Sequence, residues 1–386
     1  MEEEKIKTQN SEINQDIASL QNISKLQSKE EKSKEDKFVV VAKKERFDII
    51  DALKLVAPGT PLREGIDDIV KSRRGALIVV ASSDIYDVIS GGFKVNCKFT
   101  PQKLFELSKM DGALILSSDL KKILFSNCLL IPNPDIPTDE TGTRHQAAER
   151  TAKQIKTLVI AISERKYSIT LYYNNLKYSL KDTRDILNKS LEKIQILEKQ
   201  REIYNNLLLN LNKLEVAGLV SSNDVSSILQ RIEICLRIAE MMKRDIIELG
   251  NEGALLKMRL KELIKGLDKN KKLIIKDYYN EKSQRYQKEI AKLTFDNLLE
   301  TEKLSEILFK DINEEYIKPR GYRLLEKLDF PKEDIEIIIE HFSNLNQIFE
   351  ANIGEFEKIL KSQEKSEKFL QELSNLKENI MMERTL

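Results

Sequence analysis

The sequence predicts a mixed-sheet α/β domain, followed by an all-α spine and a small all-α module. Two observations carry this prediction. Between residues 46 and 180, short apolar runs typical of buried strands alternate with helical patterns. From residue 181 to about residue 310, the strand patterns stop and long helical stripes replace them. The 386 residues are enough for two or three domains, each with its own core.

Four segments follow from these patterns. The α/β domain takes residues 46–180, the helical spine residues 181–310 and the small helical module residues 311–386. Residues 1–45 are rich in Glu, Lys, Ser, Gln and Asn, so they bury too little apolar surface to order firmly. We interpret them as a flexible extension, with a transient helix or a partner-docking peptide as the alternative.

Composition excludes several classes of protein. Lys and Arg (64) nearly cancel Asp and Glu (63), so the net charge of +1 identifies no partner. The three cysteines are far apart, and with His145 and His341 they give no usual zinc-site spacing. No apolar run approaches the roughly 20 residues that span a bilayer, and the Glu-rich start is unlike a secretory signal. We therefore expect a cytoplasmic protein that makes no membrane contact.

The α/β domain opens with two helices and a strand. Ile49–Val56 forms an amphipathic helix that Pro58 and Gly59 stop. The following apolar patterns predict a second helix over Leu62–Val70 and a buried strand over Ala76–Val80.

Further along, Gly91 and Gly92 mark a turn, and Thr100 starts a helix. The apolar side of this helix is predicted from Leu104, Leu107 and Met110. Two strands follow, over Leu114–Leu116 and around Ile123–Phe125, and they are close enough in sequence to pair as a hairpin.

The domain ends in three more strands. Leu158–Ile162 reads as a buried strand. Ile169–Tyr173 and Leu176–Leu180 form a hairpin, because Asn174 and Asn175 between them tolerate positive φ.

The spine shows apolar stripes at helical spacing. Gly218 breaks the first helix, the pattern resumes over Val225–Leu249, and Gly250 stops it. The first stripe consists of Leu187, Leu191, Ile194, Leu197, Tyr204, Leu208 and Leu211. We interpret the stripes as core and the charged faces as solvated surface, with no chemistry in this segment.

Two motifs bracket the stretch that indicates function. The first, Asp111–Ala113, precedes the apolar run at Leu114–Leu116, which places a carboxylate at a strand edge. Gly112 beside it has no side chain to block a ligand. Alone, Asp-Gly most often marks a turn.

The second motif is Gly142–Gln146. Thr143 and Gln146 fit a capping box, so a helix is predicted to begin at about Arg144. The amides and dipole of a helix start favour an anion, and Arg144 adds a cation that matches phosphate geometry. An ordinary capped surface helix is the alternative. Together, a carboxylate, a bare backbone and an anion-binding helix start suit a nucleotide with its metal.

Several motifs in order carry a family resemblance. The chain resembles the diadenylate cyclases and, more narrowly, the DNA integrity scanning proteins that carry such a cyclase at their N-terminus. The resemblance begins near Phe47 and rests on APGTPLR (57–63), GGF (91–93), ELSKMDGA (106–113), GTRHxxAER (142–150), AISER (161–165), IIELGNEG (246–253) and RGYRLL (320–325).

The resemblance implies a nucleotidyltransferase that condenses two ATP molecules into cyclic di-AMP and releases two pyrophosphates. It implies Mg²⁺ or Mn²⁺ held by Asp111, which is also the candidate to take the 3′-hydroxyl proton. The catalytic residues implied are Asp111, Arg144 and His145. The ATP-binding residues implied are Gly112, Ala113, the backbone of Leu130, Thr143, Arg144, His145, Gln146 and Ser163.

Two positions depart from the family pattern. Gln146 stands where the family usually has a second arginine, and Ala147 where it has a threonine. Gln146 carries no charge, so a reduced triphosphate affinity is expected. The alternative function is therefore a catalytically weakened nucleotide sensor, and the retained Asp111 counts against it.

A symmetric product needs two half-sites facing each other, so a homo-oligomer with face-to-face cyclase domains is expected. The resemblance implies larger assemblies, an octamer among them, with the helical spine helping to build them. It also implies binding to branched DNA, which would link the enzyme to DNA damage and repair.

The C-terminal module departs from the family at its helix-hairpin-helix motif. The corresponding stretch, Leu360–Lys365, has no glycine where the family has Gly-x-Gly. Residues 311–386 carry 11 Lys and Arg against 17 Asp and Glu, a net charge of −6, where a phosphate backbone attracts the opposite balance. We expect DNA binding here to be weakened or lost. The candidates for remaining DNA contacts are Lys318, Arg320 and Arg323.

Overall fold

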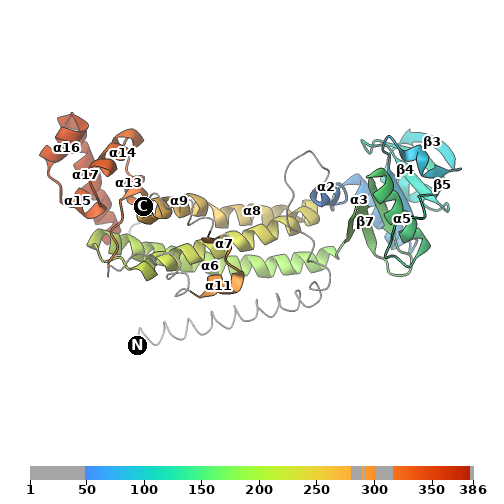
Figure 1. Cartoon of the computed structure of the whole chain (residues 1–386), viewed down its shortest axis with the longest axis horizontal. Coiled ribbons are helices and arrows are strands. Elements are labelled where there is room, and N and C mark those ends of the chain that lie inside the picture. Colours follow the sequence, from blue (N-terminus) through green and yellow to red (C-terminus); the bar gives the residue numbers. More distant parts are fainter. Residues whose placement is uncertain (1–47, 280–288, 291, 301–315, 383–386) are drawn as a thin grey trace. The chain divides into compact units, whose positions relative to one another are not determined.

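The computed structural model describes residues 48–279, 289–290, 292–300 and 316–382 (Figure 1). The predicted extension at residues 1–45 lies outside the described residues. Within them, a mixed sheet is followed by helices only, so the predicted fold class is confirmed. No helix in the described ranges combines the length and apolar character needed to cross a bilayer.

The sheet of the α/β domain has eight strands in the order β2-β5-β4-β1-β6-β7-β8, and β3 also pairs with β5. β1 and β4 run parallel, and the other neighbours run antiparallel. The strands are β1 (Ala76–Val80), β2 (Ile89–Ser90), β3 (Phe93–Lys98), β4 (Ala113–Leu116), β5 (Lys122–Leu130), β6 (Leu158–Ile162), β7 (Ile169–Tyr173) and β8 (Leu176–Ser179).

The central strands β1, β4 and β6 are apolar throughout because both of their faces are covered. Helix α5 (Thr143–Ile155) packs on one of these faces, where Ala148 and Ala152 share a buried cluster with residues of all three strands. The two alanines let the helix lie close to the sheet. The other helices of the domain are α2 (Ile49–Leu55), α3 (Pro61–Lys71) and α4 (Pro101–Leu107).

The predicted strands and turns of this domain match the structure closely. β4 and β5 form the expected hairpin, and β7 and β8 pair across Asn174, whose φ is +50°. One expectation is wrong. Met110 does not lie on the apolar side of a helix, because α4 ends at Leu107 and 45% of Met110 is exposed.

The spine consists of long helices, as predicted. α6 (Thr183–Ala217) ends at Gly218, whose φ of +70° allows the left-handed cap. α7 (Ser222–Leu249) begins with a capping box between Ser221 and Asp224, and Gly250 ends it. Shorter helices follow: α8 (Ala254–Ile264), α9 (Leu267–Tyr279) and α11 (Phe295–Leu299). Of the predicted apolar stripe of α6, Ile194, Leu197, Tyr204 and Leu211 are buried, Leu187 and Leu208 are partly buried and Leu191 is exposed.

A tyrosine on the last strand of the α/β domain contacts the spine. The Tyr178 hydroxyl on β8 donates a hydrogen bond of 2.7 Å to the Glu248 carboxylate on α7. Burial and this hydrogen bond raise the pKa of Tyr178, so its proton stays in place.

The last described residues form the predicted helical module. Its helices are α13 (Tyr322–Leu325), α14 (Lys332–His341), α15 (Leu345–Glu350), α16 (Ile353–Leu360) and α17 (Gln363–Met381). Phe356 on α16 and Phe369 on α17 are fully buried, with ring centroids 5.0 Å apart. The turn between these helices forms without glycine because Lys361 adopts a φ of +53°.

Candidate active site

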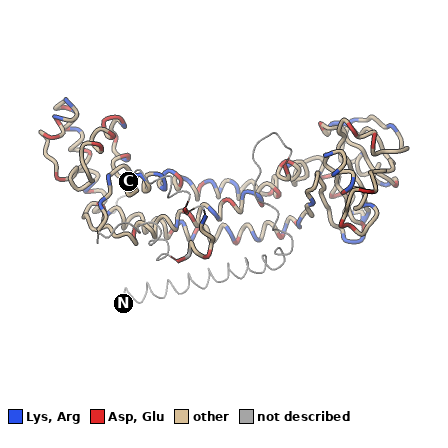
Figure 2. Tube along the Cα trace, in the orientation of Figure 1, with Lys and Arg blue, Asp and Glu red and all other residues tan. Residues whose placement is uncertain are grey.

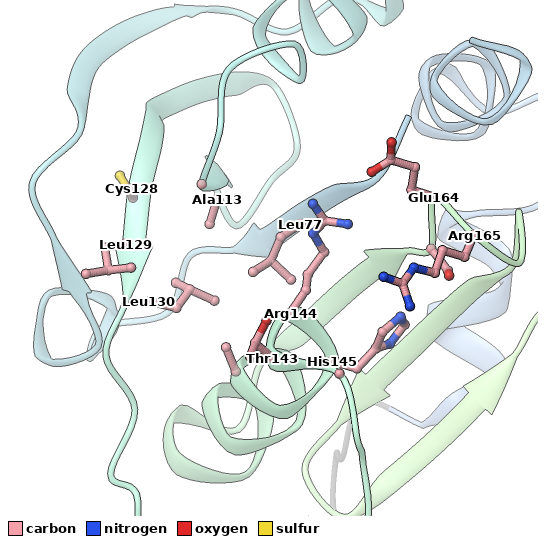
Figure 3. Close-up of a pocket in the computed structure, with 14 residues that line it drawn as sticks. Leu77, Ala113, Cys128, Leu129, Leu130, Thr143, Arg144, His145, Glu164 and Arg165 are labelled. Atoms are coloured by element: carbon pink, nitrogen blue, oxygen red, sulfur yellow. The ribbon is translucent and has the colours of Figure 1, made fainter. Parts of the chain in front are cut away.

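One end of the sheet carries a cavity of about 660 Å³ (Figure 3). The start of β4, the end of β5, the start of α5 and the segment after β6 supply its walls. This volume is in the range of small-molecule sites. The lining residues are Leu77, Gly112, Ala113, Cys128, Leu129, Leu130, Gly142, Thr143, Arg144, His145, Ala147, Ser163, Glu164 and Arg165.

Gly112 is required by the backbone as well as by the cavity. Its φ is +90°, and a Cβ added there would lie 2.7 Å from the carbonyl oxygen of Cys128 on β5. Any other residue would strain this turn and push the two strands apart. Gly112 therefore fixes the approach of β4 to β5, and with it the wall that Ala113 and Cys128 provide.

Arg144 lies against a second glycine that sequence reasoning missed. A Cβ on Gly75, just before β1, would lie 2.0 Å from a guanidinium nitrogen of Arg144. The missing side chain at Gly75 therefore provides the space that the guanidinium fills. Figure 3 shows the Arg144 side chain extending across the cavity from the start of α5. A bare glycine before a strand gave no sequence signal for this contact.

The predicted capping box of α5 is wrong. The helix begins at Thr143, its N-cap is Gly142, and no side chain caps it. The Gln146 side chain instead donates a hydrogen bond of 2.8 Å to the carbonyl oxygen of Glu140. As a result, no side chain among the described residues caps the first amides of this 13-residue helix. Uncapped amides at a helix start favour an anion.

The chain before α5 is bound along the helix by side chains spaced one turn apart. Arg150 donates to the carbonyl oxygen of Ile136 (2.9 Å), and Lys153 to that of Pro137 (2.8 Å). These contacts and the one from Gln146 fix the backbone that leads to Gly142. They position the start of α5 at the cavity.

His145 belongs to a chain of polar groups at the cavity edge. Its Nδ1 lies 2.9 Å from the Tyr172 hydroxyl on β7, which donates a hydrogen bond of 2.7 Å to the Glu140 carboxylate. Lys177 on β8 forms an ion pair with the same carboxylate. Burial raises the pKa of Glu140, but the hydrogen bonds from Lys177 and Tyr172 outweigh this and hold it below its usual value.

Asp111 precedes the cavity wall and does not line it. It is exposed and stands directly before Gly112. Among the described residues, no group of three or more His, Cys, Asp or Glu could hold a metal by itself. Mg²⁺ commonly takes one or two carboxylates and completes its shell with substrate phosphates and water. Glu164 is the carboxylate among the residues that line the cavity.

The structure brings most of the predicted site residues together. Those lining the cavity are Gly112, Ala113, Leu130, Thr143, Arg144, His145 and Ser163, whereas Asp111 and Gln146 do not line it. Their roles toward ATP stay predictions. Sequence reasoning assigned no role to the other lining residues, although Glu164 and Arg165 lie in the AISER motif that it singled out. Leu77 carried only a strand signal, and Leu129 lies beyond the strand predicted around Ile123–Phe125.

Arg323 is not a DNA contact at the surface, nor an ordinary surface charge. Only 1% of it is exposed. Its guanidinium donates to Glu215 (2.5 Å) and Asn212 (2.6 Å), both on α6. Sequence reasoning missed these partners because they lie more than 100 residues away, and the arginine instead joins the module to the spine.

The two other candidates for DNA contacts remain accessible. Lys318 is exposed and Arg320 is partly buried. In Figure 2, acidic residues lie between the basic ones on the C-terminal helices. A DNA role for either residue stays a prediction.

Comparisons with known proteins agree with these observations. Residues 63–176 match the family model described as DisA bacterial checkpoint controller nucleotide-binding, and residues 180–316 match that of the DisA linker region. The first range contains every residue that lines the cavity. The nucleotide-binding family model thus covers the part of the chain that forms the site.

Curated relatives extend the match over most of the chain. The DNA integrity scanning protein DisA of Clostridium tetani is 40% identical over 320 residues, covering 81% of this chain and 89% of that protein. DisA of Bacillus licheniformis is 43% identical over 320 residues, with the same shares covered. Among solved structures, DacA from Staphylococcus aureus matches with 20% identity and a TM-score of 0.28, covering 34% of this chain and 88% of that one. The chain belongs to the DisA family of DNA integrity scanning proteins.

Proposed function

We propose that this chain is a diadenylate cyclase that condenses two ATP molecules into cyclic di-AMP and releases two pyrophosphates. Membership of the DisA family and its nucleotide-binding domain supports a nucleotide cyclase. The observation that carries the proposal is the cavity itself. It joins a cationic end, with Arg144 and the first amides of α5, to an apolar wall that includes Leu77 and Leu130. A triphosphate suits the first and an adenine the second.

In the proposed reaction, the protein mainly positions and neutralises. Each 3′-hydroxyl attacks the α-phosphorus of the other nucleotide, forming the new ester bond as the bond to pyrophosphate breaks. Arg144 and the α5 amides bind the phosphates, and Asp111 would hold Mg²⁺ or Mn²⁺. The metal supplies charge neutralisation for the phosphates and the leaving pyrophosphate.

The product is symmetric, so the site needs a second copy of the chain facing it. Exposed apolar side chains lie next to the cavity on the end of β5 and just after it: Leu129 is 64% exposed and Ile131 is 51% exposed. Such a surface suits contact between two cyclase domains. We infer a homo-oligomer in which each cavity contributes one ATP, and turnover per subunit should fall on dilution to the monomer.

The test is incubation of the purified protein with ATP and either Mg²⁺ or Mn²⁺, with products resolved by chromatography, alongside Asp111→Asn. We expect cyclic di-AMP from the wild type and none from the variant. Glu106→Gln is the matched control, because this exposed carboxylate five residues earlier forms an ion pair with Lys109 at the surface and should be dispensable. No product with either metal, from an oligomer that still binds ATP, would favour the weakened nucleotide sensor.

A branched DNA junction added to the same reaction tests the scanning role that the relatives' name implies. The net charge of −6 over residues 311–386 argues against tight DNA binding by this module. We expect the junction to leave the rate unchanged. Suppression of the rate would show that DNA sensing is retained by another surface.

A further inference from the structure

The segment that leads into α5 is held by the helix itself. The backbone N–H of Gln146 donates to the carbonyl oxygen of Gly142 (2.9 Å), and its side chain donates to the carbonyl oxygen of Glu140 (2.8 Å). One residue in the first turn of α5 therefore binds the incoming chain at two points. These two contacts fix the backbone from Glu140 to Thr143, and with it the direction in which the chain enters the helix.

Glu140 is fixed through its other polar groups as well. Its backbone N–H donates to the Thr138 hydroxyl (3.2 Å), and its carboxylate accepts a hydrogen bond from the Tyr172 hydroxyl on β7 (2.7 Å). Lys177 on β8 forms an ion pair with the same carboxylate. The residue two positions before the N-cap of α5 is thus bound to the sheet through its side chain and to the helix through its carbonyl oxygen.

Tyr172 extends this arrangement to the cavity. Its hydroxyl oxygen lies 2.9 Å from Nδ1 of His145, so one hydroxyl group contacts both Glu140 and the ring. Only 1% of Tyr172 is exposed, so its hydroxyl has little freedom to move. His145 lines the cavity, whereas Glu140, Gln146 and Tyr172 do not. These three residues can therefore act on a ligand only through the groups that they hold in place.

A phosphate group at the start of α5 depends on this support. The amides at a helix start bind an anion when their N–H groups converge on it, and a hydrogen bond weakens steeply as its angle departs from linear. A shift in the entry of the chain turns the first amides of α5 away from their common focus. Because no side chain in the described part of the chain caps these amides, the contacts of Gln146 and Glu140 supply the support that a cap otherwise gives.

We propose that Gln146, Glu140 and Tyr172 are positioning residues for the phosphates of the bound nucleotide, acting through the first amides of α5 and through His145. This inference rests on the proposed function, because it requires a nucleotide in the cavity. It also gives Gln146 a role that the sequence did not indicate. The side chain at position 146 supports triphosphate binding by holding the backbone, without carrying a charge and without touching the ligand.

Calorimetry in the presence of Mg²⁺ with two ligands tests the inference. Both 3′-deoxy-ATP and 3′-deoxyadenosine lack the attacking hydroxyl, so no turnover occurs, and they differ only in the triphosphate. Gln146→Met keeps the length of the side chain and removes its donor. We expect it to weaken binding of 3′-deoxy-ATP roughly 5- to 10-fold and to leave binding of 3′-deoxyadenosine within about 2-fold of the wild type.

Gln154→Met is the matched control on the same helix. The Gln154 side chain, about two turns beyond Gln146, accepts a hydrogen bond of 2.8 Å from the backbone N–H of Asn133, and neither Gln154 nor Asn133 lines the cavity. This variant also loses one hydrogen bond between α5 and the chain before it, so it should lower stability to a similar extent. Its affinity for both ligands should stay within about 2-fold of the wild type.

Tyr172→Phe tests the link to His145. It removes only the hydroxyl, which leaves the ring and Glu140 without their shared partner. We expect a loss of roughly 3- to 10-fold that is again confined to 3′-deoxy-ATP. Tyr178→Phe is the matched control, because Tyr178 also donates to a glutamate, Glu248, but at the contact with the spine. It should leave both affinities within about 2-fold of the wild type.

The outcomes separate the claims. If Gln146→Met binds 3′-deoxy-ATP as tightly as the wild type, or loses affinity for both ligands equally, the positioning role of Gln146 is wrong and the proposed function stands. The same result for Tyr172→Phe would show that Tyr172 and Glu140 do not position the phosphates through His145. A wild type that binds 3′-deoxy-ATP no better than 3′-deoxyadenosine would overturn the proposed function together with this inference.

Discussion

Two arginines of this chain share one local pattern and have opposite surroundings. Arg144 follows Gly142 by two residues at the start of α5, and Arg323 follows Gly321 by two residues at the start of α13. In both helices the glycine is the N-cap and forms no side-chain cap. Yet Arg144 lines an open cavity, whereas Arg323 is buried between the module and the spine.

The difference lies in what occupies the helix start. At α13, the carboxylate of Asp277 on α9 accepts the amides of Gly321 (2.8 Å), Tyr322 (2.6 Å) and Arg323 (3.0 Å). At α5, no side chain among the described residues takes that place. When a carboxylate of the protein binds the first amides, as at α13, the helix start joins two parts of the fold. When no carboxylate does so, as at α5, the amides are available to an anionic ligand.

Arg323→Ala should have the largest effect, because it leaves Glu215 and Asp277 buried without their cation. We expect a loss of about 3–5 kcal/mol in the free energy of unfolding of the C-terminal module and its joint. Urea unfolding followed by regional hydrogen exchange measures it. Arg320→Ala, three residues earlier and partly exposed, should cost within about 0.5 kcal/mol. Equal effects of the two variants would contradict the distinction drawn between the two arginines.

Arg144→Ala should lower activity and leave stability almost unchanged. Because the guanidinium faces the cavity, its removal should leave stability within about 0.5 kcal/mol. Formation of cyclic di-AMP should fall at least about 100-fold through loss of phosphate stabilisation. Unfolding and product assays on the same variant measure the effect on stability and the effect on activity separately. An unstable Arg144→Ala with normal turnover per folded subunit would make Arg144 a structural residue like Arg323.

The stability of the α13 joint and that of the cavity edge should also change in opposite directions with pH. Burial raises the pKa of Asp277 to about 7, so the folded state holds a proton that the unfolded state releases above about pH 4. Its contribution to stability is present at low pH and is lost as pH rises toward 7. The pKa of Glu140 is lowered, so its contribution is present above its unfolded pKa and is lost as pH falls.

Hydrogen exchange at the amides of α9 and α13, corrected for the intrinsic rate, tests this difference. Between pH 5 and 7 we expect protection at the joint to fall by an amount on the order of 2 kcal/mol. Asp277→Asn should remove the slope, whereas Asp268→Asn, an exposed acid on the same helix, should keep it. Rising protection over this interval would contradict the raised pKa of Asp277.

The contrast also shows how far sequence reasoning reaches. Patterns of apolar spacing located most strands of the sheet, and the motifs at Asp111–Ala113 and Gly142–Gln146 located the cavity. These features are local, because a strand or a helix start depends on neighbours along the chain. Most of what failed depended on distant partners, which were Asp277 and Glu215 for Arg323 and Gly75 for Arg144. The partner of Gln146, the Glu140 carbonyl, lies only six residues earlier, but no residue pattern marks a backbone carbonyl as an acceptor. No local pattern distinguishes an arginine that binds a ligand from one that binds the fold.

The smallest expected effect concerns the hairpin without glycine. Lys361 holds a φ of +53° between α16 and α17, which strains a non-glycine residue. Lys361→Gly should relieve about 1–2 kcal/mol of strain. The entropy that glycine loses on folding offsets about 0.5–1 kcal/mol of this, so the module should gain about 0.5–1 kcal/mol. Asn174→Gly, at a φ of +50° in the hairpin of β7 and β8, is the matched change in the α/β domain and should gain less, because asparagine tolerates this conformation.

The same variant tests whether the missing glycine or the acidic charge limits DNA binding. Lys361→Gly supplies the backbone freedom that the family's hairpin has, but it leaves residues 311–386 even more negative. If charge dominates, a branched junction should bind the variant no better than the wild type at any salt concentration. A gain in affinity with the added glycine would show that backbone amides, and not net charge, decide binding. The C-terminal module would then be a ligand site like the start of α5.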